Sequence, residues 1–221
     1  MAEVVHEPGR ERSRRIINVL VAALGLLASA PVLLLIALAI RLTSRGPIFY
    51  SQTRVGLDRR SDRGHEPNSR RQANLGGRPF RIYKFRTMRV QPPGQAPEVW
   101  ATPDDPRVTT VGRVLRKFRL DELPQLWNVL VGDMNIVGPR PEQPGIFAEL
   151  RQQIDGYHLR QRVRPGITGW AQVNHTYDQC LEDVRRKVSL DLEYVARHSV
   201  LEDLRIMALT VPVMVGRKGG W

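Results

Sequence analysis

An uncharged, apolar segment near the N-terminus places the strongest constraint on this chain. Residues 16–40 read IINVLVAALGLLASAPVLLLIALAI and contain no charged side chain. A helix rises about 1.5 Å per residue, so this segment is long enough to cross a hydrocarbon core of roughly 30 Å. A cleaved signal peptide fits poorly, because its apolar region is shorter and because Arg41 follows here instead of a small-residue cleavage site. The sequence therefore predicts a basic N-terminal tail over 1–15 and a membrane-embedded helix over 16–41.

Two topologies are compatible with this segment. Positively charged residues favour the cytoplasmic face, so a spanning helix would place one of the two flanking arginine groups on the unfavourable side. Pro31 lies inside the segment, and proline removes a backbone donor and kinks or breaks a helix. A Pro-broken, re-entrant helix would keep both basic flanks in the cytoplasm, whereas a spanning helix with a proline kink is also common. The flanking arginines are Arg10, Arg12, Arg14 and Arg15 before the segment and Arg41, Arg45 and Arg54 after it.

The charge of the chain points to an anionic partner. The formal net charge is +12, and 30 of the 34 basic residues are arginine, whose planar guanidinium suits phosphate groups. Nucleic acid, anionic lipid and a phosphorylated substrate all fit this charge. A nucleic-acid binder would show a helix-turn-helix or a basic stripe interleaved with aromatic residues. The sequence shows neither, and we expect no nucleic-acid partner. The single cysteine, Cys180, excludes an intrachain disulfide.

Residues 42–221 are predicted to form one compact cytosolic catalytic domain of the α+β class. Two runs rich in aromatic and β-branched residues, 47–56 and 79–88, predict a short β-hairpin. The polar stretch between them predicts a flexible loop insertion over 58–77. We expect the last helix to lie in the core rather than on the membrane surface. Apolar spacing predicts helices at 111–118, 121–131, 142–153, 181–197 and 200–215.

Two adjacent carboxylates, Asp121 and Glu122, stand at the start of the predicted helix over 121–131. Acidic side chains favour a helix N-terminus, where unpaired N–H groups and the helix dipole attract negative charge. On the residues alone, helix capping is the better explanation for this pair.

Several motifs together favour a functional role for this carboxylate pair over helix capping. The chain resembles the bacterial sugar transferases, a family of monotopic phosphoglycosyl transferases, from about residue 15 to its C-terminus. Many relatives carry a multi-span N-terminal region that does not precede the match here, so the resemblance implies the minimal catalytic form. It also favours a re-entrant helix broken at Pro31. The stretches that carry the resemblance are SAPVLLLIALAIRLTSRGPIFYSQTRVG, FRIYKFRTM, RLDELPQLWNVLVGDMNIVGPRP and RVRPGITGWAQVN.

The resemblance implies a polyprenyl-phosphate hexose-1-phosphate transferase at the cytoplasmic face of the inner membrane. Such an enzyme moves sugar-1-phosphate from a UDP-sugar to undecaprenyl phosphate and initiates synthesis of exopolysaccharide or a related glycan. The alternative is a non-catalytic, membrane-tethered scaffold that binds anionic lipid, and such a scaffold would not need Asp121 or Glu122. The sugar, the pathway and the oligomeric state are not determined by the sequence.

The resemblance also implies a role for each site residue. Asp121 would attack the sugar-bearing phosphorus and form a covalent phosphosugar-aspartyl intermediate, while Glu122, with Asp121, would hold Mg²⁺. Arg140 is the strongest substrate-binding candidate, because the prolines on both sides fix its backbone. Trp170 and Gln172 either shape the nucleotide pocket or pack in the core. The full set of predicted substrate-binding residues is Lys84, Arg86, Arg116, Arg140 and Arg164.

Three features depart from the family pattern. Ala30 separates Ser29 from Pro31, whereas the family often has serine directly before the proline. The loop over 58–77 is longer than the usual short turn. Many relatives read Gly-Arg-Asn after AQVN, whereas this chain reads His175-Thr176-Tyr177-Asp178. One phosphate contact must therefore come from another residue.

Overall fold

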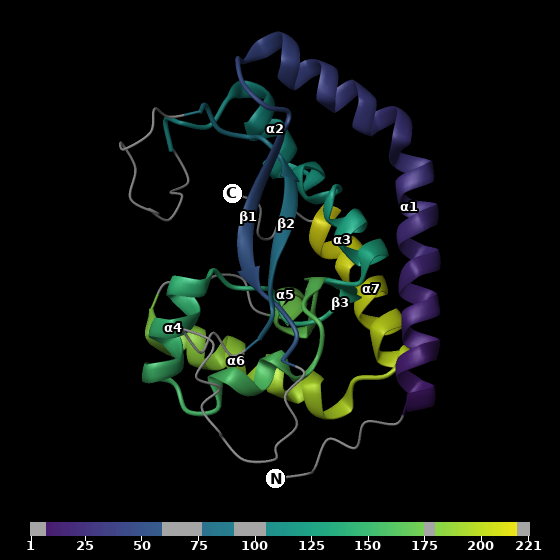
Figure 1. Cartoon of the computed structure of the whole chain (residues 1–221), viewed down its shortest axis with the longest axis vertical. Coiled ribbons are helices and arrows are strands. Elements are labelled where there is room, and N and C mark those ends of the chain that lie inside the picture. The colour runs from purple at the N-terminus through teal and green to yellow at the C-terminus, as the bar shows by residue number, and fades with distance from the viewer. Residues whose placement is uncertain (1–7, 59–76, 91–104, 175–179, 216–221) are drawn as a thin grey trace.

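The computed structural model describes residues 8–58, 77–90, 105–174 and 180–215 (Figure 1). It has the expected mixed architecture: one long N-terminal helix, a short antiparallel hairpin and a small domain of helices. The elements are α1 (Pro8–Thr43), β1 (Phe49–Val55), β2 (Pro79–Phe85), α2 (Thr110–Lys117), η1 (Leu120–Glu122), α3 (Gln125–Val131), β3 (Asn135–Val137), α4 (Pro144–Gln153), η2 (Tyr157–Arg162), β4 (Gly166–Thr168), α5 (Trp170–Asn174), α6 (Leu181–Arg197) and α7 (Val200–Val215).

Helix α1 is bent rather than interrupted. Its span runs through Pro31, and it already begins at Pro8, so the second half of the predicted basic tail is helical. Figure 1 shows α1 running along one side of the domain and bending over it before the chain enters β1. Pro31 lacks the N–H that would bond the carbonyl of Leu27, and the Ser29 hydroxyl donates to the carbonyl of Gly25 at 2.7 Å. Both features favour bending of a helix.

One face of α1 packs on the domain and the other is exposed. Ala22 joins a core cluster with Val129 and Met134 of the α3–β3 region, while Ile36 and Ile40 pack near Phe85. Only 11% of the most apolar window of the helix is buried in the protein, and by length and composition the helix could cross a membrane. An exposed apolar face of this size needs another apolar cover. Its exposed leucines include Leu20, Leu24, Leu27, Leu34, Leu35 and Leu38.

The hairpin lies at the centre of the domain (Figure 1). Strands β1 and β2 pair antiparallel, with Tyr50 opposite Lys84, which confirms the hairpin expected from the sequence. Asn128 of α3 is fully buried behind it. Its side-chain amide donates to the carbonyl of Arg81 at 2.7 Å and accepts from the N–H of Tyr83 at 3.1 Å. These two bonds fix α3, and the segment just before it, against β2.

A second, parallel pair joins β3 to β4, with Asn135 opposite Gly166 and Val137 opposite Thr168. The sequence indicated only short extended pieces at these two places. The pair is tightly apposed, because a Cβ atom on Gly138 would come within 2.3 Å of the carbonyl oxygen of Arg164. The Gly138 position therefore requires glycine, and the turn that follows β3 is fixed against the segment before β4.

The prediction of a single helix over 121–131 is wrong, because this region forms the short 3₁₀ turn η1 followed by α3. Pro124 has no N–H, so the i→i−4 bond to Leu120 is missing there. Instead, the N–H groups of Leu123 and Leu126 donate to carbonyls three residues back, at 3.3 and 3.1 Å. Helix α3 then begins at Gln125, with Pro124 at its N-cap. Asp121 therefore lies in the turn ahead of the helix rather than in its first turn.

The last two helices match their predicted ranges, and α2 and α4 lie within one or two residues of theirs. Ile206 of α7 is fully buried, which confirms the core location of one side of that helix, whereas Leu201 and Leu204 are exposed. The 3₁₀ helix η2 and the short helix α5 were not predicted. Nearly all of the predicted loop over 58–77 and the His175–Asp178 segment lie outside the described residues.

Candidate active site

The two adjacent carboxylates lie in η1, directly after a residue with unusual backbone geometry. Arg119 has φ 53° and ψ 22°, in the left-handed region that non-glycine residues rarely adopt. Arg119 separates the C-cap of α2, Phe118, from η1, so helix α2 does not continue into η1. Asp121 and Glu122 are both largely buried, with 9% and 8% of their surfaces exposed. Burial of two adjacent carboxylates is costly unless cations compensate.

Glu122 receives that compensation from two elements. Lys84 of β2 donates to its Oε1 at 2.8 Å, and Arg140, in the turn after β3, donates to the same oxygen at 2.6 Å. Although burial alone would raise it, the pKa of Glu122 is held far below its usual range by the charges and hydrogen bonds of Arg140 and Lys84. Glu122 is therefore a fixed negative charge.

Asp121 is in a different environment. Its carboxylate accepts no hydrogen bond from any residue in the described part of the chain. Burial, followed by the negative charge of Glu122, raises the pKa of Asp121, and the charges of Lys84, Arg116 and Arg140 partly oppose this shift. A largely buried carboxylate that accepts no hydrogen bond from the described residues is well suited to act as a nucleophile or a metal ligand.

Arg116 approaches the pair from α2. Its Nε donates to the hydroxyl of Thr87 at 3.0 Å, in the segment after β2. Helix α2 lies very close to this segment, because a Cβ atom on Gly112 would meet the Thr87 carbonyl oxygen at 2.0 Å. Three of the five predicted substrate-binding cations, Lys84, Arg116 and Arg140, therefore influence the Asp121 carboxylate.

The other two predicted cations lie at the ends of α1. Arg86 donates to the backbone carbonyls of Ser44 and Arg45 and to the Ser44 hydroxyl, so it caps the C-terminal end of that helix. Arg164 contacts Glu11 near the N-terminal end, at 3.1 Å. These bonds give both arginines a structural role, and their binding of substrate stays a prediction.

Trp170 and Gln172 also make contacts within the protein. The Trp170 ring lies beside the guanidinium groups of Arg197 and Arg205, 4.4 and 5.4 Å from the ring centre. The Gln172 side chain donates to the carbonyl of Ile167 at 2.9 Å. These contacts give both side chains a place in the packing of the domain, and a role in a nucleotide pocket stays a prediction.

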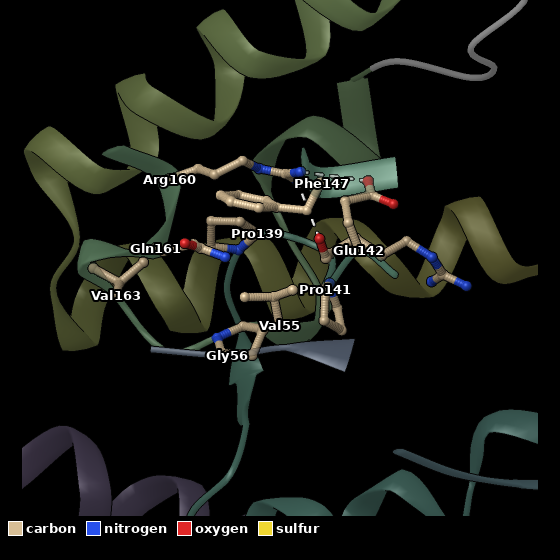
Figure 2. Close-up of a pocket in the computed structure, with 11 residues that line it drawn as sticks. Val55, Gly56, Pro139, Pro141, Glu142, Phe147, Arg160, Gln161 and Val163 are labelled. Atoms are coloured by element: carbon tan, nitrogen blue, oxygen red, sulfur yellow. Dashed lines mark hydrogen bonds and ion pairs between the residues drawn. The ribbon is translucent and has the colours of Figure 1, made fainter. Parts of the chain in front are cut away.

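A buried charged cluster behind Arg140 was not anticipated. Figure 2 shows Arg160 and Glu142 beside Pro139 and Pro141, the two neighbours of Arg140 in the sequence, at a small pocket that Phe147 and Val55 also line. Arg160 is 3% exposed and forms an ion pair with Asp191 of α6 at 2.6 Å. In a chain with so many arginines, no local signal distinguishes a buried arginine from a solvated one.

The carboxylate pair can supply only part of a metal site, and other ligands such as substrate phosphates and water would have to complete it. Among the described residues, no group of three or more histidine, cysteine, aspartate or glutamate side chains is arranged to hold a metal. Mg²⁺ is commonly bound by one or two carboxylates, with substrate phosphates and water completing its shell. Asp121 and Glu122 therefore fit the protein's share of a site of this kind.

Comparisons with known proteins identify the family of this chain. The family model described as "Bacterial sugar transferase" matches residues 9–217. The UDP-glucose:undecaprenyl-phosphate glucose-1-phosphate transferase of Escherichia coli (strain K12) is 44% identical over 90% of this chain and 39% of its own length. An N-acetylgalactosaminephosphotransferase of Aeromonas hydrophila, which uses undecaprenyl phosphate, is 40% identical over 90% of this chain and 42% of its own length. The exopolysaccharide production protein PSS of Rhizobium leguminosarum bv. phaseoli is 33% identical over 94% of this chain and 98% of its own length.

The chain thus spans about two-fifths of the length of the first two relatives and nearly all of the third. The family match covers the carboxylate pair, its three surrounding cations and the long apolar helix. The chain therefore belongs to the bacterial sugar transferase family.

Proposed function

We propose that this protein transfers sugar-1-phosphate from a UDP-sugar to undecaprenyl phosphate at the cytoplasmic face of the inner membrane. The observation that carries this proposal is the contrast within the carboxylate pair. Glu122 is clamped by two cations, whereas Asp121 beside it is buried and accepts no hydrogen bond from the described residues. Relatives named for UDP-glucose and for N-acetylgalactosamine both match, so the identity of the sugar is not part of the proposal.

The reaction proceeds in two displacements. A carboxylate oxygen of Asp121 attacks the sugar-bearing phosphorus of the donor, the bond to the bridging oxygen breaks, and UMP leaves with the electron pair. A phosphate oxygen of undecaprenyl phosphate then attacks the same phosphorus and releases the Asp121 carboxylate. Lys84, Arg116 and Arg140 supply positive charge where the phosphoryl oxygens accumulate negative charge. Dividing one transfer into two steps lets each substrate react in turn at the same residue.

Mg²⁺ fits this proposal as a partner of the substrate. Asp121 and Glu122 would hold it, and it would neutralise charge on the diphosphate. Because the Oε1 of Glu122 already accepts from Lys84 and Arg140, its other carboxylate oxygen is the one expected to bind the metal.

The contacts at both ends of α1 support a re-entrant arrangement in the membrane. Near its N-terminal end, Arg14 pairs with Asp203, and Arg15 donates to the carbonyls of Val129 and Leu130 at 2.5 and 2.7 Å. Just after its C-terminal end, Arg86 of the domain donates to the carbonyls of Ser44 and Arg45. Because one domain contacts both ends of this apolar helix, we propose that the helix enters and leaves the membrane on the same side.

The catalytic proposal is tested by trapping the intermediate. Purified protein is incubated with Mg²⁺ and a panel of radiolabelled UDP-sugars without lipid acceptor. We expect one sugar to leave label on the protein, and Asp121→Asn to abolish this labelling. Asp155→Asn, an exposed substitution of the same kind, serves as the control and should label normally. Turnover with undecaprenyl phosphate but no protein label would refute the covalent step. Neither label nor turnover with any sugar would refute the transferase proposal and favour the lipid-binding scaffold.

The topology is tested with single cysteines in a Cys180→Ser background. Arg12→Cys and Arg45→Cys place exposed thiols before and after the apolar segment. A membrane-impermeant maleimide should label neither thiol in intact spheroplasts and both in inside-out vesicles. Labelling of one of the two in spheroplasts would show a spanning helix.

A further inference from the structure

We propose that Arg160 is a positioning residue for the transfer reaction, acting through Arg140. This inference rests on the proposed function, in which Arg140 clamps Glu122 and faces the phosphates. Arg160 itself is buried in η2, and every bond that it makes is to the protein interior behind the site. It therefore does not contact the substrate.

The need for such a residue comes from the sequence of the turn that carries Arg140. Pro139 and Pro141 lack N–H groups, so neither residue can donate a backbone hydrogen bond that would fix this turn. Its carbonyl oxygens still need donors. The Pro139 carbonyl accepts from the N–H of Gly166 at 3.0 Å, and the Pro141 carbonyl accepts from Arg54 at 3.3 Å.

Arg160 supplies the donor at the central residue. One terminal nitrogen, Nη2, donates to the Arg140 carbonyl at 3.1 Å and to Asp191 at 2.6 Å. The other, Nη1, donates to the Glu142 carboxylate at 3.3 Å and to the hydroxyl of Tyr157 at 2.9 Å. The dashed lines that leave Arg160 in Figure 2 mark bonds to the Glu142 carboxylate and to a backbone carbonyl of the turn, so one rigid guanidinium fixes the turn at two points.

The Glu142 end of the turn is anchored further. Lys187 of α6 donates to the same Glu142 oxygen at 3.0 Å, and the backbone carbonyl of Glu142 accepts from the N–H of Val55 at 2.9 Å. From this fixed backbone, the Arg140 side chain reaches Glu122 at 2.6 Å. A small movement of the turn would therefore displace the guanidinium that sets the charge and position of Glu122.

Stability alone is a poor explanation for this cluster. Arg160 and Asp191 are 3% and 2% exposed, and a buried ion pair is often no more stable than apolar residues of similar volume. What the pair provides is a directed donor to the Arg140 carbonyl, which an apolar side chain cannot supply.

The test is a double-mutant cycle between Arg160 and Arg140. We compare the wild type, Arg160→Lys, Arg140→Lys and the double variant, using UMP release from the UDP-sugar that the wild type turns over. Lysine keeps the charge at residue 160 but cannot span Asp191, Glu142 and the Arg140 carbonyl together. We expect Arg160→Lys to lower kcat on the order of 10- to 100-fold with little change in KM, because misplacement of a charged group acts on the transition state. In the Arg140→Lys background the same change should cost about twofold or less.

Asp191→Asn keeps the shape of the cluster and guards against misfolding of the lysine variant. It should give a smaller loss of kcat, which also disappears in the Arg140→Lys background. Arg185→Lys on α6, an exposed arginine in an exposed ion pair with Glu182, should leave kcat unchanged.

Equal fold-losses in the two backgrounds would overturn the positioning role, because they would mean that Arg160 does not act through Arg140. An Arg140→Lys variant as active as the wild type would overturn it as well. The absence of turnover by the wild type would instead refute the proposed transferase function, so the two failures are distinguishable.

Discussion

The Arg14→Met substitution is expected to cause a large loss of stability, because Arg14 links the membrane helix to the domain through a buried network. Its Nε donates to Asp203 at 3.0 Å, and an Nη donates to the hydroxyl of Tyr194 at 2.7 Å. Arg14, Asp203 and Tyr194 are 3%, 4% and 1% exposed. The Tyr194 hydroxyl also contacts the carbonyl of Val137 in β3, at 3.1 Å.

The magnitude follows from what the substitution leaves behind. Methionine retains most of the volume but leaves the Asp203 carboxylate buried without its cation. Removing one partner of a buried ion pair costs about 3–5 kcal/mol of unfolding free energy. For a domain of this size, each kcal/mol lowers Tm by about 2–4 °C, so we expect a decrease of roughly 6–20 °C.

The pH dependence identifies the cause of the loss. Burial already raises the pKa of Asp203 above its usual value, and Arg14 opposes that shift. Without Arg14 the folded-state pKa rises further, so the folded protein binds a proton that the unfolded chain releases above about pH 3.9. Stability then falls as pH rises from the unfolded to the folded pKa. The deficit of Arg14→Met relative to the wild type should therefore be larger at pH 8 than at pH 5.

The assay is thermal unfolding in nanodiscs, followed by tryptophan fluorescence. Adding Asp203→Asn to Arg14→Met should recover at least about 1 kcal/mol, because the unpaired charge is then removed. Arg12→Met, an exposed change on the same helix, is the matched control. A loss below about 1 kcal/mol that does not vary with pH would refute the reasoning.

Three further predictions concern the site and its supports. The initial transfer rate should rise with pH through the pKa of Asp121, which burial raises, because only its carboxylate form attacks; a rate that falls over this range would contradict this. Gly112→Ala should lower the free energy of unfolding by about 1–3 kcal/mol, seen as a lower Tm, because the new Cβ would lie 2.0 Å from the Thr87 carbonyl oxygen. Gly145→Ala, with nothing within 4 Å of the new Cβ, should be neutral or stabilising by up to about 1 kcal/mol in the same melt. Asn128→Ala should cost about 2–3 kcal/mol in denaturant unfolding, since two backbone groups of β2 lose their partner; an unchanged midpoint would exclude this linkage.

Much of the fold could be predicted from local sequence patterns. The ranges of α6 and α7 follow from apolar spacing, the hairpin follows from two β-rich runs, and α1 follows from an uncharged segment. Each of these signals lies within one stretch of chain, where composition and periodicity act directly. The carboxylate pair was found through its motif, because on local evidence alone a capping role was favoured.

Other features depended on residues that are distant in sequence. The parallel β3–β4 pair joins segments about thirty residues apart, and neither is long enough to be predicted as a strand. The split between η1 and α3 was missed because the apolar spacing continues through Pro124, although the missing N–H changes the bonding there.

Local residue patterns are enough to predict that this chain has an apolar helix, a hairpin and a carboxylate pair set among arginines. The role of each cation, in contrast, depends on which distant elements surround it in the folded protein. Arg140 meets Glu122, Arg86 caps α1, and Arg160 lies buried behind the site. The thirty arginine side chains are chemically identical, so their roles differ only because their surroundings differ. Burial and ion pairing are set by contacts between distant elements, and no local pattern records them.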